Sequence, residues 1–387
     1  MVSATLSLYI IVIILSECLL EKKLQSRSDM KERDSRIDVI RLVALASLIT
    51  VHFIKNMELY RVIVIGRRWL FVCLLRQFGM CCIPLFLLIT GYLMKEKVYS
   101  KGYYRKIIRT LVIYVMASVI SDFWLIVATG SGYNIKGLML QILNFTACPY
   151  AWYVELYIGL FLIIPFLNDV YVGLDEKGKR RLIVTMLVLS ALPSFTNVYR
   201  SGPLEWWLTP SSDATYFKII PEYWRGVWPI TYYYLGCWIR DRKISIKRST
   251  NVFLIAVSMV LFALYNYWRS HGSPFIWGTW QDWGSWMNTV LSVLFFMLLL
   301  NIPYKRICTP VLATLANAVF GAYLLSWIPE QVVYKNVISH NPEPLDRVKY
   351  CPLILAVYIA SIIMSLFLSG IYKVLAIGVK RLKEGKQ

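Results

Sequence analysis

The stretch RLVALASLITVH, residues 41–52, decides the fold of this 387-residue chain. Ten mostly apolar residues separate Arg41 from His52, so the segment resembles a membrane helix with an ionisable group at each end. Eleven steps of 100° return to within about 20° of the same helix face and cover roughly 16 Å along the axis. Ionisable groups inside a bilayer are costly, and they indicate function. Two simpler interpretations stay open: a snorkelling Arg41 and an interfacial His52 bonded to backbone.

The overall composition is that of an integral membrane protein. Hydrophobic residues make up 58% of the chain and the mean hydropathy is +0.55, whereas soluble domains are about 45 to 50% apolar. A spanning helix needs about 20 predominantly apolar residues, and no polar stretch is long enough for a separate soluble domain. We predict an all-α integral membrane protein, a ten-helix bundle with spans at residues 37–54, 77–94, 110–128, 151–170, 182–198, 225–240, 251–268, 285–302, 311–334 and 351–378.

The charge distribution and the cysteine positions bear on two classes of function, nucleic-acid binding and metal binding. The formal charge is +20, but the basic residues form short clusters between apolar runs, which is typical of membrane topology and argues against nucleic-acid binding. The eight cysteines are scattered, without a CxxC pair or metal-ligand spacing. The sequence therefore assigns neither a nucleic-acid partner nor a metal site.

The charges of the loops predict an orientation. Of the 42 Lys and Arg residues, 27 lie in the segments on one side of the predicted bundle, residues 22–36 included, and 11 lie in the loops on the other side. Lys and Arg mark the cytoplasmic side of a bilayer. Both ends of the ten-helix body are thus expected in the cytoplasm.

The first 29 residues form an N-terminal apolar extension. Residues 4–20 lack a basic region before them, contain Glu17 and are a poor signal peptide. Two interpretations stay open: an extra N-terminal span, or a start-site artefact, because Met30 also reads as a natural beginning. The main transmembrane domain is expected over residues 30–387.

A basic cluster precedes the third predicted span. Arg105, Lys106 and Arg109 are three or four residues apart and can share one helix surface. Guanidinium groups bind phosphates bidentately, so this surface suits the phosphates of a soluble donor. Plain positive-inside topology explains the same cluster, and from this cluster alone that interpretation is favoured.

The outer loops are rich in aromatic residues, notably 203–210, 221–236 and 267–286. Such rings can stack on the faces of sugars. Tyr and Trp also gather at the headgroup level of any membrane protein, and that interpretation is favoured here.

Five motifs resemble, in order, the membrane-bound acyltransferase 3 family. They are RIDVIRLVALASLITVHF, with its arginine and histidine eleven apart; IPLFLLITGYLMKEK, with Thr90 at the usual serine position; YYRKIIRTLVIY, similar to an RxxR motif; AWYVELYIGLFLIIPFLN; and YYYLGCWIRDRK. The resemblance covers residues 36 to about 378.

This resemblance implies a ten-helix membrane enzyme that transfers an acyl group, usually acetyl from acetyl-CoA, to a hydroxyl of a cell-surface glycan or its lipid-linked precursor. It implies that His52 is the catalytic histidine, supported by Arg41, Lys106 and Arg109. Chemistry agrees, because an imidazole can take the acceptor's hydroxyl proton near neutral pH. It implies no bound cofactor, with acetyl-CoA as the donor substrate.

Two positions depart from the family pattern. Ser326 stands where many members have a histidine, so a second catalytic histidine is not supported. Many members carry a glutamate five residues after the fourth-helix tryptophan, whereas Glu155 follows Trp152 by three. We retain Trp152 and Glu155 as candidate cavity-lining residues.

The expected function is therefore O-acyl transfer to an envelope glycan in a bacterial plasma membrane, with acyl-CoA, the glycan and the lipid bilayer as partners. A transporter or flippase for glycans or lipids is one alternative, because it would also use intramembrane Arg and His. A membrane sensor or anchor module is another, although the short tail after Lys380 argues against it.

Overall fold

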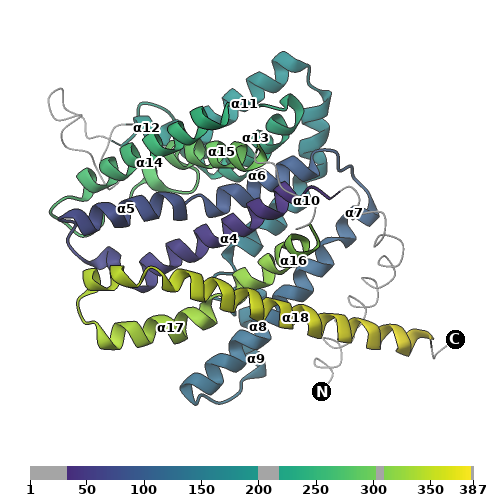
Figure 1. Cartoon of the computed structure of the whole chain (residues 1–387). Coiled ribbons are helices and arrows are strands. Elements are labelled where there is room, and N and C mark those ends of the chain that lie inside the picture. Colours follow the sequence, from purple (N-terminus) through teal and green to yellow (C-terminus); the bar gives the residue numbers. More distant parts are fainter. Residues whose placement is uncertain (1–32, 199–217, 302–308, 385–387) are drawn as a thin grey trace.

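The computed structural model describes residues 33–198, 218–301 and 309–384, and within these residues every regular element is a helix (Figure 1). The predicted N-terminal extension and the aromatic segment 203–210 lie outside the described residues. The longer helices are α4 (Ser35–Asn56), α5 (Arg67–Gly79), α6 (Cys82–Met94), α8 (Ile107–Thr129), α9 (Ile135–Leu143), α10 (Trp152–Gly173), α11 (Glu176–Ser190), α13 (Trp228–Arg242), α14 (Arg248–Ser270), α15 (Trp286–Leu300), α16 (Thr309–Leu325), α17 (Trp327–His340) and α18 (Leu353–Glu384). Short helices α7 (Lys101–Arg105) and α12 (Pro193–Thr196) complete the α-helical set.

The helices agree with a multi-pass membrane protein. In the described part of the chain, seven helical segments are long and apolar enough to span a bilayer, and the pair α16 and α17 qualifies as an eighth, bent span. The predicted spans at 182–198 and 225–240 fall largely on α11 and α13, which have 15 residues each. The all-α membrane fold is confirmed, and the ten-span count stays a prediction.

Helix α4 lies in the middle of the bundle, where it packs against α5, α6, α16 and α18. Its first turn is capped by Asp34, whose side chain accepts a hydrogen bond from the backbone N–H of Arg36. In Figure 1, α4 begins and α18 ends at the same end of the bundle. Arg41 and His52 both lie on α4, so one helix connects these two residues, as predicted.

A close glycine contact joins α6 to α13. A Cβ on Gly91 would lie 1.9 Å from the carbonyl oxygen of Tyr233, and a Cβ on Gly236 would lie 2.3 Å from that of Leu88. Only glycine fits at such distances. The glycines of two motifs that are far apart in the sequence therefore meet at one helix crossing.

Two spans are broken helices. The span predicted at 77–94 begins ten residues earlier, at Arg67, and is interrupted between α5 and α6. The span predicted at 311–334 bends by 59° between α16 and α17. The bend follows Ser326, whose hydroxyl donates to the carbonyl oxygen of Tyr323, and it directs the first turn of α17 toward α4.

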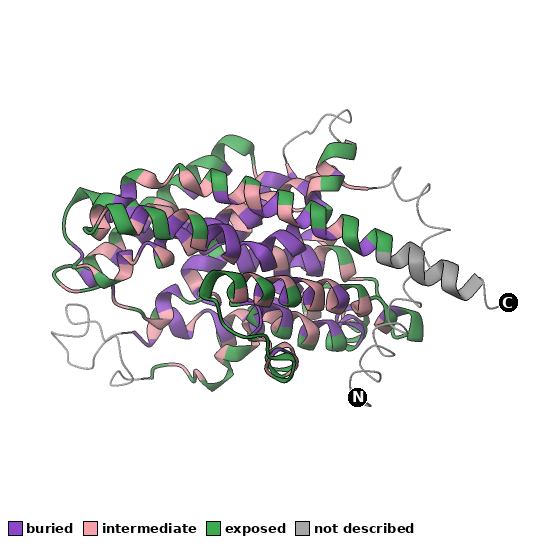
Figure 2. Ribbon diagram, turned by 90° about the horizontal axis from the view of Figure 1, so that it is seen from below, coloured by how far each residue is buried: buried purple, intermediate pink, exposed green. Residues whose placement is uncertain are grey.

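Burial is concentrated at the centre of the bundle, whereas the periphery is exposed (Figure 2). Large apolar side chains on the periphery are open to the surroundings, among them Phe123, Phe253 and Phe367, which are 65 to 72% exposed. A surface of this kind suits lipid rather than water.

Two connecting segments are tied together at the end of the bundle where α4 ends. The backbone N–H of Val64 donates to the carbonyl oxygen of Ser273 at 2.8 Å, and the N–H of Gly272 donates to that of Val64 at 3.1 Å. The loop after α4 and the aromatic loop after α14 are therefore joined by backbone hydrogen bonds at this end of the bundle.

Candidate active site

His52 is held by a buried carboxylate from the other end of the chain. Its Nδ1 lies 2.9 Å from Oε1 of Glu330, which is in the first turn of α17 and fully buried. A carboxylate accepts hydrogen bonds, so Nδ1–H is the donor and Nε2 keeps its lone pair. The pair has the geometry of a general base with an orienting acid.

Two further groups hold Glu330. The Tyr150 hydroxyl donates to Oε2 at 2.5 Å, and Nδ2 of Asn56 donates to the same oxygen at 2.8 Å. The ring of Tyr150 also stacks on the imidazole of His52, with 3.7 Å between centroids. Burial, with the neighbouring Glu330 carboxylate, raises the pKa of the Tyr150 phenol, so Tyr150 remains a donor. The position of His52 is therefore fixed by two contacts, the hydrogen bond to Glu330 and the stacked ring of Tyr150.

His52 opens into a cavity of about 370 Å³, which we call the outer cavity after the orientation predicted from the sequence. The side chain of His52 is 12% exposed. Trp152 and Trp283, whose rings stack 6.1 Å apart, contribute to its wall. The other lining residues used below are Lys55, Tyr60, Trp277, Gln281, Asp282 and Tyr323.

A second cavity, of about 410 Å³, contains the basic residues and is called the inner cavity. Arg41 of α4 and Arg109 of α8 both line it. Nη1 of Arg41 lies 3.0 Å from Oδ1 of Asp38, a carboxylate that is 1% exposed and is also bound by Arg33 through two nitrogens. The buried acid therefore fixes one side of the Arg41 guanidinium.

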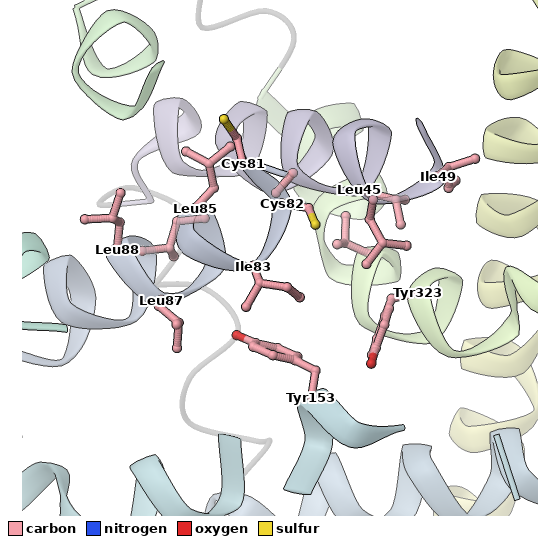
Figure 3. Close-up of a cluster of buried hydrophobic side chains, with 14 of the residues drawn as sticks. Leu45, Ile49, Cys81, Cys82, Ile83, Leu85, Leu87, Leu88, Tyr153 and Tyr323 are labelled. Atoms are coloured by element: carbon pink, nitrogen blue, oxygen red, sulfur yellow. The ribbon is translucent and has the colours of Figure 1, made fainter. Parts of the chain in front are cut away.

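Tyr323 separates the two cavities and lines both. Its ring meets that of Tyr153 edge to face at 6.0 Å, and Figure 3 shows the two tyrosines facing Ile83 and Cys82. The Tyr323 hydroxyl donates to the backbone carbonyl of Tyr150. The partition thus contacts the residue that stacks on His52.

The remaining predicted site residues are distributed unevenly. Trp152 lines the outer cavity, whereas Glu155 is on an exposed face of α10 and lines neither cavity. Arg105 and Lys106 are exposed at the junction of α7 and α8, one turn or less before Arg109, and line neither cavity. Among the described residues, no group of three or more His, Cys, Asp or Glu side chains is placed to hold a metal.

Glu330, Tyr150 and Asn56 were missed by the sequence analysis. Glu330 had a detectable signal, because it is the one acidic residue inside the apolar run predicted to span 311–334, and intramembrane carboxylates indicate function. Nothing in the sequence alone joined it to His52, which is 278 positions away.

The fold and the site define a helical, multi-pass membrane protein in which one histidine–carboxylate pair and one basic cavity lie on opposite sides of a tyrosine partition. The model of the acyltransferase 3 family, described as an acyltransferase domain, matches residues 34–370. The chain belongs to this family, and it is a membrane acyltransferase. Comparisons with curated proteins and with solved structures give no match.

Proposed function

We propose that the protein moves an acyl group, acetyl in the simplest case, from cytoplasmic acyl-CoA to a hydroxyl of a cell-surface polysaccharide or lipid-linked glycan precursor in a bacterial plasma membrane. One observation carries the proposal. A histidine oriented by a buried carboxylate faces one cavity, and two arginines face another, with a single tyrosine lining both.

The transfer uses His52 as a base. Nε2 takes the proton of the acceptor hydroxyl while that oxygen attacks the thioester carbonyl carbon. A C–O bond forms, the C–S bond breaks, and the leaving thiolate takes the proton from the imidazolium. Glu330 stabilises the imidazolium through Nδ1–H, in the manner of a triad acid. Atoms and charges balance without a further reagent.

The donor occupies the inner cavity in this mechanism. Arg41 and Arg109 bring two guanidinium groups to its wall, and such groups bind phosphates in a planar, bidentate way. Arg105 and Lys106, close to Arg109 in sequence, extend positive charge beyond the cavity. Thr90, at the family's serine position, adds a hydroxyl to the same wall.

The acceptor occupies the outer cavity. The stacked pair Trp152 and Trp283, with Trp277, presents indole rings beside His52. Aromatic faces pack against the apolar faces of sugars, while the rims of the rings stay polar. These contacts support sugar stacking for the tryptophans that line the outer cavity. The membrane-belt interpretation still applies to tryptophans outside this cavity.

The test is transfer of labelled acetyl from acetyl-CoA to glycan in membranes that contain the protein. Wild-type membranes should label the glycan, and His52→Ala membranes of equal protein content should not. Absent labelling in the wild type, with a glycolipid still crossing the membrane, would favour the transporter alternative. Absent labelling and absent transport would favour the sensor or anchor alternative.

A further inference from the structure

Arg76 is a buried cation without an ion-pair partner among the described residues. It is in α5, is 1% exposed, and none of its three guanidinium nitrogens makes a hydrogen bond of standard geometry with the described residues, although its charge acts on the Tyr60 hydroxyl and on Asp282. The rings of Phe275 and Trp277 lie 5.0 and 5.1 Å from its central carbon and supply cation–π attraction. An arginine stays charged in proteins, and ring contacts do not replace the hydrogen bonds lost on burial.

Arg76 lies directly behind the wall of the outer cavity. Trp277, which covers the guanidinium, lines that cavity and is 53% exposed. Two more lining residues have a buried polar atom without a partner in the described part of the chain: the hydroxyl of Tyr60 and Oε1 of Gln281. Unsatisfied groups from three segments therefore meet at one wall.

The charges around the outer cavity do not balance. Asp282 is paired with Arg225, and Glu330 is occupied by His52, Asn56 and Tyr150. Lys55 lines the cavity and has no ion pair among the described residues, as Arg76 has none. Lys55 and Arg76 thus have no ion-pair partner, and the groups named here carry a net charge of +1.

We propose that the outer cavity contains an anionic subsite, in which Arg76 and Lys55 bind a negatively charged group, carboxylate or phosphoryl, of a sugar-containing ligand. Trp277 covers Arg76 in the empty site and turns aside when the ligand binds. Tyr60 then donates its hydroxyl to the same group, so the buried donors of Arg76 and Tyr60 are satisfied by one anion, whereas Oε1 of Gln281, an acceptor, is not. That this ligand is the acyl acceptor rests on the proposed function; the anionic subsite itself does not.

The experiment measures binding without an acyl donor. Full-length protein in lipid nanodiscs is titrated by calorimetry, at low salt, with glucuronate, glucose 1-phosphate and glucose. We expect at least one of the anions to bind about tenfold more tightly than glucose or better, since hydrogen bonds to charged groups exceed neutral ones. The stronger of the two anions identifies carboxylate or phosphoryl as the natural group.

Variants locate the subsite. Arg76→Gln should bring the anions down to the affinity of glucose, and Arg76→Lys should restore part of the preference, because it keeps the charge but not the planar fork. Lys55→Gln changes an exposed residue at the end of α4 and should reduce the preference without a folding defect. The matched control is Lys335→Gln, an exposed lysine on α17 outside the cavity, which should bind as the wild type does.

Two results would overturn the subsite: equal affinity of the wild type for all three probes, or an anion preference that survives in both Arg76→Gln and Lys55→Gln. Failure of the proposed function is a separate result. Anion preference without acetyl transfer to any glycan contradicts the proposed reaction alone, whereas transfer to glycans without anion preference contradicts the subsite alone.

Discussion

The two cavities are similar in volume but differ in how their functional groups are held. In the outer cavity, His52 is bonded to Glu330 of α17 and stacked on Tyr150, and Asn56 and Tyr150 both donate to the Glu330 carboxylate. In the inner cavity, Arg41 is held on one side by Asp38, while Arg109 is exposed. A base must be aligned within tenths of an ångström, whereas phosphate binding tolerates movement. In the proposed mechanism, the cavity that needs an aligned base is the one whose histidine has more contacts, and the cavity that needs only positive charge has an exposed arginine.

The largest effect should come from removing the base in the outer cavity. His52→Ala is expected to lower the rate of acyl transfer by about 10² to 10⁴, roughly 3 to 5.5 kcal/mol of barrier. His52→Gln should fail equally, because an amide accepts no proton at neutral pH. His340→Ala changes an exposed histidine of α17 and serves as the control. Glycan acetylation by mass spectrometry is the measurement, and near-normal acetylation by His52→Gln would make His52 a structural residue.

A smaller loss should follow when Glu330 is changed but His52 remains. Glu330→Gln still offers an oxygen to Nδ1, but it cannot balance the charge of the imidazolium, so we expect a loss on the order of 10²-fold in kcat. Tyr150→Phe removes one donor to the same carboxylate and should lose less. The control is the exposed Glu343→Gln. An unchanged pH–rate profile and rate in Glu330→Gln would show that the carboxylate only supports packing.

Substitutions in the inner cavity should change KM for the donor more than kcat. Arg109→Ala is expected to raise KM for acetyl-CoA about tenfold with a smaller change in kcat, since charged hydrogen bonds are each worth about 1.5 to 3 kcal/mol. Arg109→Lys should recover only part, because a point charge replaces a planar fork. Arg181→Ala, an exposed arginine of α11, is the matched control. If both Arg109 variants keep the wild-type KM, the donor binds elsewhere.

Local features of the chain could be predicted from the sequence, whereas contacts between distant segments could not. The spacing of Arg41 and His52 and the apolar run between them are local, so a helix carrying both residues was predictable, and both are found on α4; their roles stay a prediction. The apolar runs predicted an all-α membrane fold for the same reason. The basic cluster at residues 105–109 was equally visible, although only Arg109 of its members lines the inner cavity.

The parts that depend on contacts between distant segments were not predictable. Glu330 meets His52 only because the chain bends by 59° after α16, and no periodicity records that bend. Arg76 stood at the edge of the span predicted at 77–94, but α5 begins at Arg67 and places it inside the bundle. Glu155 was retained as a cavity-lining candidate although its spacing departs from the family pattern, and α10 places it on an exposed face.

The smallest effect on activity is expected from two cysteine substitutions at loop serines. Labelling of these cysteines tests which cavity faces outward. Ser249→Cys follows the basic segment 240–248, and Ser273→Cys lies in the aromatic loop tied to Val64 beside the outer cavity. Because basic segments stay in the cytoplasm, an impermeant thiol reagent should label Ser273→Cys in intact cells and Ser249→Cys only after permeabilisation, with acetylation unchanged in both.

The labelling background must lack reactive thiols. Among the described cysteines only Cys351 is partly exposed, and the others are buried; all eight are replaced so that the undescribed ones do not contribute. Labelling of Ser249→Cys alone in intact cells would invert the arrangement. His52 would then face the cytoplasm and Arg109 the outside, and a soluble acyl-CoA could not reach the inner cavity. The donor and acceptor assignments of the two cavities would have to be exchanged, although the His52–Glu330 pair would keep its geometry.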